Sequence, residues 1–313
     1  MNKVRPSRVV VTVLLAVAAV AAVGALLAQV HSHAFLPDPV VALAHDSMTI
    51  PLTITGGRPT VQVQINGSGP YPFILDTGAE GTLITADLAE KLKLAVVGAV
   101  NVASPGAPTP RAGKLVKIEK VELGDLTLTE VVAAALDLSS MPKVFSGADA
   151  PLGVLSVRGW KGLLVTVDYP ASKIAIRRGQ LGAADNMEIY QFGTHDRLPT
   201  ITIDLAGVAV AATVDTGAAR GIVLPRALLT KLPLAAKPVA AEGLRTVSGE
   251  QSVSLAQLKG QLKIGSYSVE GPELNFVEEF PVANLGYPIL RNFAVTVDWQ
   301  SGRVELKRSA APS

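Results

Sequence analysis

Two short stretches carry most of the structural information in this sequence. Residues 73–79 read FILDTGA, and residues 212–218 read ATVDTGA. In each stretch, apolar and β-branched residues lead into Asp-Thr-Gly, and an alanine follows. A continuous apolar run is typical of a strand buried on both faces, and Asp and Gly favour a tight turn directly after it. The repeat therefore predicts two buried strands, each ending in a carboxyl group: Asp76 and Asp215.

The surroundings of the two motifs repeat as well. Each motif follows a Pro-Thr pair that opens an alternating run, and the proline precedes the aspartate by 17 and 16 positions. A period of roughly 130–140 residues is far longer than that of a solenoid repeat, which predicts two copies of one small domain. Further matches lie at residues 152–153 and 285–286 (Leu-Gly) and at residues 165–168 and 295–298 (Val-Thr-Val-Asp).

Turn residues and residue patterns divide the chain into four segments. We expect an N-terminal segment over residues 1–47, a first lobe over 48–182, a linker over 183–197 and a second lobe over 198–313. Thr85 is the predicted N-cap of a helix over residues 86–94. The second lobe repeats the order of the first, so the predicted fold class is all-β. In the first lobe the sequence pattern predicts strands over residues 48–55, 60–66, 72–76, 114–123, 126–136, 162–168 and 173–178, with a loop over 101–113.

Composition excludes several functional classes. The chain has 313 residues, no cysteine and a formal net charge of +2. Without cysteine there are no disulfides, thiol nucleophiles or Cys-type metal sites, and the Lys and Arg residues form no cluster suited to nucleic acid. No His-Glu-x-x-His, Gly-x-Gly-x-x-Gly or Gly-x-Ser-x-Gly pattern occurs. We therefore expect no metal, no cofactor and no nucleic-acid partner.

The N-terminal segment predicts the cellular location of the protein. Lys3, Arg5 and Arg8 precede an uncharged run over residues 9–30, which is 22 residues long. About 20 apolar residues suffice to cross a bilayer, and the basic flank is expected to stay in the cytoplasm. We therefore expect a hydrophobic helix that anchors the protein in the membrane, residues 31–47 as a tether, and lobes in the periplasm or cell envelope. A cleaved signal peptide is the alternative, because the residues after the run include a small-x-small site.

The two turns support hydrolytic chemistry if folding brings them together. Gly78 and Gly217 allow the backbone to bend sharply and to approach the opposite loop without a Cβ atom. Two carboxyl groups about 3 Å apart cannot both ionise, so Asp76 and Asp215 are expected to hold one proton between them. Such a pair titrates as a unit. One member then accepts a proton from water while the other donates a proton to the substrate.

The duplicated Asp-Thr-Gly-Ala resembles the aspartic peptidase family over about residues 59–306. Ala79 and Ala218 make it more similar to the retropepsin-like branch than to the pepsin-like branch. The chain looks like two retropepsin-like units fused in tandem, as in bacterial two-lobed aspartyl proteases. The resemblance implies two β-barrel lobes related by pseudo-two-fold symmetry and hydroxyl hydrogen bonds exchanged between Thr77 and Thr216. It also implies a monomeric endopeptidase that cleaves extended peptides without a covalent intermediate or a cofactor.

The family also needs a flap, a hairpin that closes over the substrate and excludes water. In the second lobe, residues 246–250 form a predicted hairpin tip with Ser248 and Gly249 near its centre. In the first lobe, residues 103–107 are the equivalent segment, with Gly106 at the turn. We therefore expect these two segments to contact the substrate.

Two charged residues stand close to the motifs. Glu80 directly follows the first copy, and Arg220 lies two positions after Ala218. The arginine has three possible roles: to pair with Glu80, to select an acidic substrate side chain, or to hold the carboxyl pair fully ionised and inactive. Neither Ala79 nor Ala218 can donate a hydroxyl hydrogen bond to a carboxylate. We therefore expect activity nearer neutral pH than that of pepsin-like enzymes.

Two further hypotheses stay open at the level of sequence. In one, the protein is a non-catalytic relative that binds extended peptides at the cell envelope, a role that Arg220 favours. In the other, lobes pair between chains, so that each lobe builds its carboxyl pair with a copy of itself.

Overall fold

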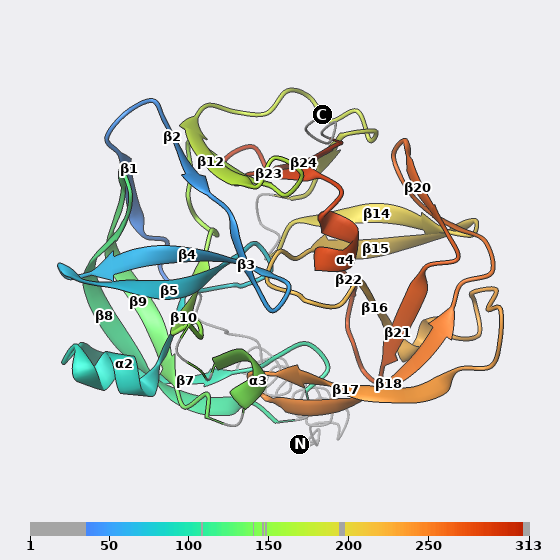
Figure 1. The fold of residues 1–313 in the computed structure, drawn as a ribbon, viewed down its shortest axis with the longest axis horizontal. Coiled ribbons are helices and arrows are strands. Elements are labelled where there is room, and N and C mark those ends of the chain that lie inside the picture. Colours follow the sequence, from blue (N-terminus) through green and yellow to red (C-terminus); the bar gives the residue numbers. More distant parts are fainter. Residues whose placement is uncertain are drawn as a thin grey trace, which may run out of the picture. The chain divides into compact units, whose positions relative to one another are not determined.

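The computed structural model describes residues 36–308, apart from residues 108, 140, 146, 148 and 194–197 (Figure 1). The chain divides into two compact units, Met1–Leu36 and Pro37–Ser313, and both lobes belong to the second. The predicted hydrophobic helix over residues 9–30 lies outside the described residues. Within the described part of the chain, no helix combines the length and the apolar character that a membrane span requires.

The first lobe is a β-sheet that closes on itself. Its strands follow the order β1-β9-β6-β10-β5-β4-β8-β7, and a direct pairing of β8 with β9 completes a ring. Thr85 caps helix α2 (Ala86–Lys91) as predicted, because its hydroxyl oxygen accepts a hydrogen bond from Leu88 N. The only other helix in this lobe's described residues is α3 (Pro142–Phe145). The strands are β1 (Val40–Leu43), β2 (Ser47–Pro51), β3 (Thr53–Thr55), β4 (Arg58–Ile65), β5 (Ser68–Asp76), β6 (Leu83–Thr85), β7 (Ala95–Val102), β8 (Arg111–Leu123), β9 (Leu126–Leu136), β10 (Gly153–Ser156), β11 (Leu163–Asp168) and β12 (Lys173–Arg178).

The second lobe has the same strand order as the first, but two strands of the first lobe each correspond to two shorter strands in the second. Its order is β17-β18-β21-β16-β22-β15-β14-β19-β20. β18 and β19 together take the place of β8, and β20 and β21 take the place of β9. Two short helices, η1 (Arg226–Leu228) and α4 (Tyr287–Leu290), complete the lobe. The strands are β13 (Ile189–Gln191), β14 (Thr200–Leu205), β15 (Val208–Val214), β16 (Ile222–Pro225), β17 (Val239–Thr246), β18 (Gly249–Gln257), β19 (Gln261–Ile264), β20 (Tyr267–Glu270), β21 (Glu273–Val277), β22 (Ala283–Leu285), β23 (Ala294–Asp298) and β24 (Arg303–Lys307).

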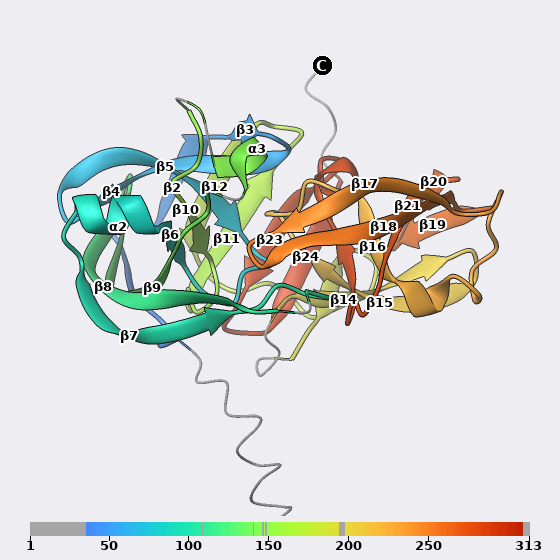
Figure 2. The same cartoon turned by 90° about the horizontal axis from the view of Figure 1, so that it is seen from below.

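A third sheet joins the two lobes. Its order is β13-β24-β23-β11-β12-β2, and Figure 2 shows β11, β23 and β24 between the two groups of strands. The two Val-Thr-Val-Asp segments are antiparallel partners at its centre, where Thr166 pairs with Thr296 and their hydroxyl oxygens lie 2.9 Å apart. Because the two copies of one segment pair with each other, the duplicated halves meet at a local two-fold axis.

Asp168 and Asp298, which end the two repeated segments, have structural roles. The carboxylate of Asp168 accepts a hydrogen bond from Ala171 N, and that of Asp298 accepts hydrogen bonds from Gln300 N and Ser301 N. Both side chains therefore stabilise the hairpin turns that follow them.

The structure corrects three predicted boundaries. The predicted tether over residues 31–47 contains β1, which pairs with β9, so the first lobe begins before residue 48. The predicted linker over residues 183–197 contains β13, which pairs with β24. The predicted loop over residues 101–113 starts inside β7 and ends inside β8. β1 and β13 are short and β7 is mostly exposed, so the sequences of these three strands do not alternate between polar and apolar residues.

Candidate active site

Asp76 and Asp215 stand at the ends of two equivalent buried strands. β5 ends at Asp76, and β15 ends at the residue before Asp215. The preceding residues, Leu75 and Val214, are fully buried. Each strand is held by a parallel neighbour, β10 for β5 and β22 for β15. The backbone at both aspartates is therefore fixed by the sheet and by the core beneath it.

The two threonines of the motifs exchange hydrogen bonds between the lobes. Thr77 N donates to the Thr216 hydroxyl at 3.1 Å, and Thr216 N donates to the Thr77 hydroxyl at 3.0 Å. The Thr77 hydroxyl donates to Val214 O at 2.7 Å, and the Thr216 hydroxyl donates to Leu75 O at 2.8 Å. Both side chains are buried. This reciprocal exchange locks the two loops together, in the manner that the family resemblance implies.

The two glycines allow each loop to lie against the opposite carboxyl group. A Cβ atom added at Gly78 would collide with the carboxyl group of Asp215, and one added at Gly217 would collide with that of Asp76. The charge of Asp215 raises the pKa of Asp76, which agrees with the close approach of the two loops. Folding therefore brings together the two side chains that the repeat singled out.

Burial and mutual repulsion make the pair hard to ionise fully. Burial raises the pKa of Asp76 well above the usual value of an aspartate, and the charge of Asp215 raises it further. The Gly78 N–H, which donates to Asp76 Oδ1 at 2.7 Å, acts in the opposite direction. Burial also raises the pKa of Asp215, although hydrogen bonds oppose that shift. Two neighbouring carboxyl groups whose pKa values are both raised keep one proton between them.

Two residues that the sequence did not indicate approach the pair. Arg58, at the start of β4, donates from Nε to Gly217 O at 2.8 Å, and its positive charge lowers the pKa of both aspartates. The pKa of Arg58 is itself lowered by burial. Asn284, in β22, donates from Nδ2 to Asp215 Oδ2 at 2.6 Å. A basic residue at the start of an otherwise uncharged, alternating strand was the one available signal for Arg58.

The family assignment agrees with this geometry. A family model described as aspartyl protease matches residues 61–153 and residues 201–289, one range in each lobe. The chain belongs to this aspartyl protease family. A comparison with curated proteins found no match. The two matched ranges place one Asp-Thr-Gly in each repeat, so the family match and the internal duplication agree.

The strand registers of this family member correct one sequence match. The Leu-Gly at residues 152–153 is not the counterpart of the Leu-Gly at residues 285–286. Leu155 pairs with Leu75 just as Leu285 pairs with Val214. Val154 is therefore the counterpart of Asn284, and Leu155 is the counterpart of Leu285. The Leu-Gly of the first lobe lies three residues before the position that corresponds to the Leu-Gly of the second lobe.

A tyrosine also lies near the carboxyl pair. The Tyr169 hydroxyl is buried and has no hydrogen-bond partner among the described residues, and its ring centroid lies 5.7 Å from that of Tyr287. Burial raises the pKa of Tyr169, and the charges of Asp215 and Asp76 raise it further. Its phenol therefore stays neutral and adds no charge to the site.

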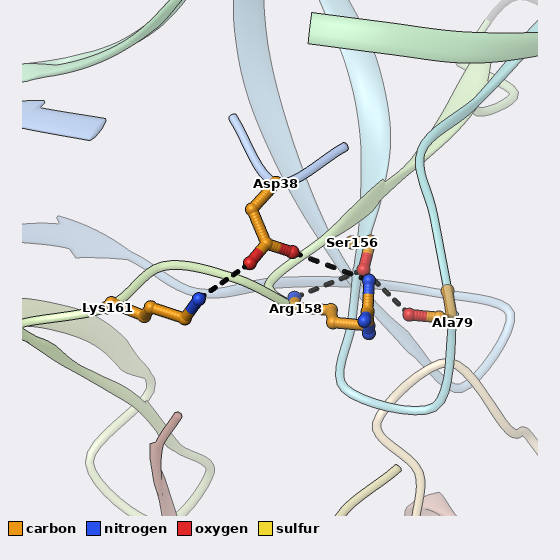
Figure 3. A network of polar contacts seen from close by, with 5 residues as sticks. All are labelled: Asp38, Ala79, Ser156, Arg158 and Lys161. Carbon is orange, nitrogen blue, oxygen red and sulfur yellow. Dashed lines mark hydrogen bonds and ion pairs between the residues drawn. The ribbon is translucent and has the colours of Figure 1, made fainter. Parts of the chain in front are cut away.

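The carbonyl of the alanine after each glycine is held differently in the two lobes. In the first lobe, the Ser156 hydroxyl donates to Ala79 O at 2.6 Å and accepts from Arg158 N (Figure 3). The Arg158 guanidinium and Lys161 Nζ both contact the Asp38 carboxylate, which ties the start of the described chain to the turn after β10 (Figure 3). In the second lobe, Tyr287 N donates to Ala218 O at 2.9 Å.

Arg220 points to a strand of its own lobe. Its Nη1 donates to Asn275 Oδ1 at 2.8 Å, and its Nη2 donates to the carbonyl oxygens of Glu242 and Gly243 in β17. These contacts join the loop after Asp215 to β17, while Glu80 is exposed. The cation whose charge acts on both carboxyl groups is Arg58, from the first lobe.

The two predicted flap segments contact each other. The second is a hairpin of β17 and β18, and the Ser248 hydroxyl at its tip accepts from Ser104 N and donates to Val102 O, both at 2.9 Å. Gln251 Nε2 donates to Pro105 O at 2.9 Å. Gly106 has a φ of 72°, a backbone conformation that favours glycine, and a Cβ atom there would lie 2.6 Å from Gln251 Oε1. Ser248 therefore uses its hydroxyl to join the two hairpin tips.

Proposed function

We propose that this chain is an aspartic endopeptidase that hydrolyses extended peptide segments with water activated between Asp76 and Asp215. The observation that carries the proposal is the opposition of two partly buried carboxyl groups across the Thr77–Thr216 exchange. Their raised pKa values suit a pair that holds one proton and one negative charge.

The proposed reaction needs one ionised and one protonated carboxyl group. The carboxylate accepts a proton from water while the water oxygen bonds to the scissile carbonyl carbon. The protonated partner donates its proton to the carbonyl oxygen, which gives a neutral gem-diol. As the gem-diol collapses and the C–N bond breaks, the carboxyl group that took a proton from water donates it to the leaving nitrogen, and the other carboxylate accepts a proton from one hydroxyl group of the gem-diol. Each carboxyl group thus acts once as a base and once as an acid in the cycle.

Edge strands support binding of an extended peptide. β7 and β17 lie at the ends of the two lobe sheets, and each leads to one of the joined hairpin tips. An extended peptide can add to such an edge through main-chain hydrogen bonds, with alternate side chains on opposite sides. Because Ser248 and Gln251 join the tips, we propose that the tips separate to admit the peptide and join again over it.

Cleavage of a peptide library tests the proposed activity. The full-length protein in detergent micelles is incubated with the library, with and without a statine-type mimic of the gem-diol. We expect cleavage that the mimic blocks. Peptide binding without cleavage would support the non-catalytic alternative, although Arg220, the residue that favoured it, is bound to Asn275 and β17. Cleavage that the mimic leaves unchanged would contradict the proposal.

We also propose that the protein acts as a monomer outside the cytoplasm. The shared sheet pairs β11 with β23 of the same chain, which supports a complete site in one molecule. The basic residues before the uncharged run at residues 9–30 support a membrane anchor or a signal peptide. Sedimentation of the active species and fractionation of cells test these two points. Activity found only in a dimer, or protein found only in the cytosol, would contradict them.

A further inference from the structure

The surroundings of the two carboxyl groups differ although their loops match. By strand register, the residue equivalent to Asn284 in the first lobe is Val154, because Val154 pairs with Ile74 as Asn284 pairs with Thr213. Valine has no hydrogen-bond donor in its side chain. Asp215 therefore accepts a hydrogen bond from a side chain of its own lobe, Asn284. Val154, at the equivalent position in the first lobe, cannot donate one to Asp76.

The chemistry of the amide gives this difference a direction. Asn284 Nδ2 lies 2.6 Å from Asp215 Oδ2, and a hydrogen bond from a neutral donor to a carboxylate stabilises the ionised form. Asn284 Oδ1 is buried and has no hydrogen-bond partner among the described residues. An apolar side chain would avoid that unpaired atom, and the first lobe carries one at the equivalent position. The amide therefore packs less favourably than an apolar side chain would, but it stabilises a negative charge on Asp215.

We propose that Asn284 is a positioning residue that fixes the negative charge on Asp215, so that Asp76 holds the shared proton before the substrate binds. This inference rests on the proposed peptidase function for its catalytic meaning. In the reaction, Asp215 then takes the proton from water, and Asp76 donates its proton to the substrate carbonyl oxygen.

The other groups near Asp215 are consistent with this assignment. Arg58 donates to Gly217 O in the loop of Asp215, and the residue equivalent to Arg58 in the second lobe is Leu198, whose side chain carries no charge. Tyr169 stays neutral. The Gly217 N–H lowers the pKa of Asp215, as the Gly78 N–H lowers that of Asp76. Gly78 N donates to Asp76 Oδ1 at 2.7 Å, whereas Asp215 Oδ1 is buried without a hydrogen-bond partner among the described residues, so the charge on Asp215 depends on the Asn284 amide at Oδ2.

The test measures the two carboxyl groups directly and needs no peptidase activity. In full-length protein labelled with 13C at the aspartate carboxyl carbons, NMR follows the Asp76 and Asp215 signals against pH, assigned with Asp76→Asn and Asp215→Asn. We expect Asp215 to ionise at lower pH than Asp76. Asn284→Val should raise the pH at which Asp215 ionises by about 1–2 pH units. If the protein also cleaves peptides, the acid limb of its kcat/KM profile should move upward by a similar amount.

A reciprocal variant serves as the matched control. Val154→Asn gives Asp76 the equivalent donor and should lower the pH at which Asp76 ionises, with Asn284 intact. Ionisation of Asp76 before Asp215 in the unaltered protein would overturn the proposal, and that measurement does not depend on either variant folding. An unchanged or lowered ionisation pH for Asp215 in folded Asn284→Val would also overturn it. Absence of peptide cleavage, with the expected titration, would refute only the proposed peptidase function.

Discussion

The carboxyl groups of Asp76 and Asp215 occupy an environment that opposes a second negative charge. Burial is the largest cause of both raised pKa values, and the negative charge of Asp215 raises the pKa of Asp76 further. The loops tolerate this because the reciprocal bonds of Thr77 and Thr216 hold them together. The site therefore combines strong structural restraint with an unfavourable charge, which is common at catalytic centres.

A neutral replacement at residue 76 should stabilise the folded protein at neutral pH. Because the folded-state pKa of Asp76 is raised, its contribution to stability is complete at low pH and is lost as pH rises toward that folded pKa. Asp76→Asn removes this pH dependence while keeping the acceptor for Gly78 N. We expect the free energy of unfolding at pH 7 to rise by about 1 kcal/mol or more.

Denaturant unfolding at pH 7 and pH 3 checks this expectation. The difference between Asp76→Asn and the unaltered protein should shrink at pH 3, where the aspartate is protonated in both states. A variant that is less stable at pH 7, or a difference that grows toward low pH, would show that Asp76 is stabilising as an anion.

Removal of the Arg58 charge should move the pH dependence of activity upward. The guanidinium lowers the pKa of both carboxyl groups, so its loss in Arg58→Met raises both. We expect both limbs of the kcat/KM profile to move to higher pH by about half a unit to one unit. Arg58→Lys keeps the charge and should shift the profile less. A shift to lower pH, or none, would contradict the electrostatic role.

At the level of the loops, close contact between the lobes depends on two glycines. Alanine at Gly217 would place a methyl group against the Asp76 carboxyl group. We expect Gly217→Ala to lower the free energy of unfolding by about 1–3 kcal/mol, as overpacking typically does, and to abolish peptide cleavage.

The matched control for this prediction is Gly182→Ala. A Cβ atom at Gly182 would make only an ordinary contact, 3.8 Å from Ile189 Cδ1. Its denaturation midpoint should stay close to that of the unaltered protein. Equal midpoints for the two alanine variants would mean that the loops have more room than the structure indicates.

The joined hairpin tips should loosen when one hydroxyl group is removed. Ser248→Ala deletes the acceptor of Ser104 N and the donor to Val102 O. We expect the amide hydrogen of Ser104 to exchange about fivefold faster, which corresponds to the loss of one typical hydrogen bond. The exposed Ser252 on β18 offers the control variant Ser252→Ala. Unchanged exchange at Ser104 in Ser248→Ala would show that other contacts hold the tips together.

At the level of the whole chain, the duplication was predictable because it repeats identical chemistry at matched spacing. The two Asp-Thr-Gly turns, the strands before them and the Thr85 cap follow from local residue preferences. The pairing of β11 with β23 involves the very segments that are identical in sequence. Local pattern and overall architecture therefore agree wherever a segment is buried and regular.

Other features could not be predicted because they depend on tertiary contacts. β1 and β13 are short strands that complete sheets built by distant segments. Arg58 reaches the opposite lobe, and Asn284 reaches Asp215 from a neighbouring strand whose register the Leu-Gly match misplaced. Sequence spacing gives no distance between such residues. The asymmetry of the site was therefore visible only once the strands were in register.

The most direct test of the central claim is the rate of peptide cleavage by Asp76→Asn and Asp215→Asn, each with its fold verified by circular dichroism. If one carboxyl pair activates water, each single substitution should reduce kcat/KM by about a hundredfold to ten-thousandfold or more, although the two aspartates belong to different lobes. A folded variant of either kind that cleaves peptides at the rate of the unaltered protein would contradict the account.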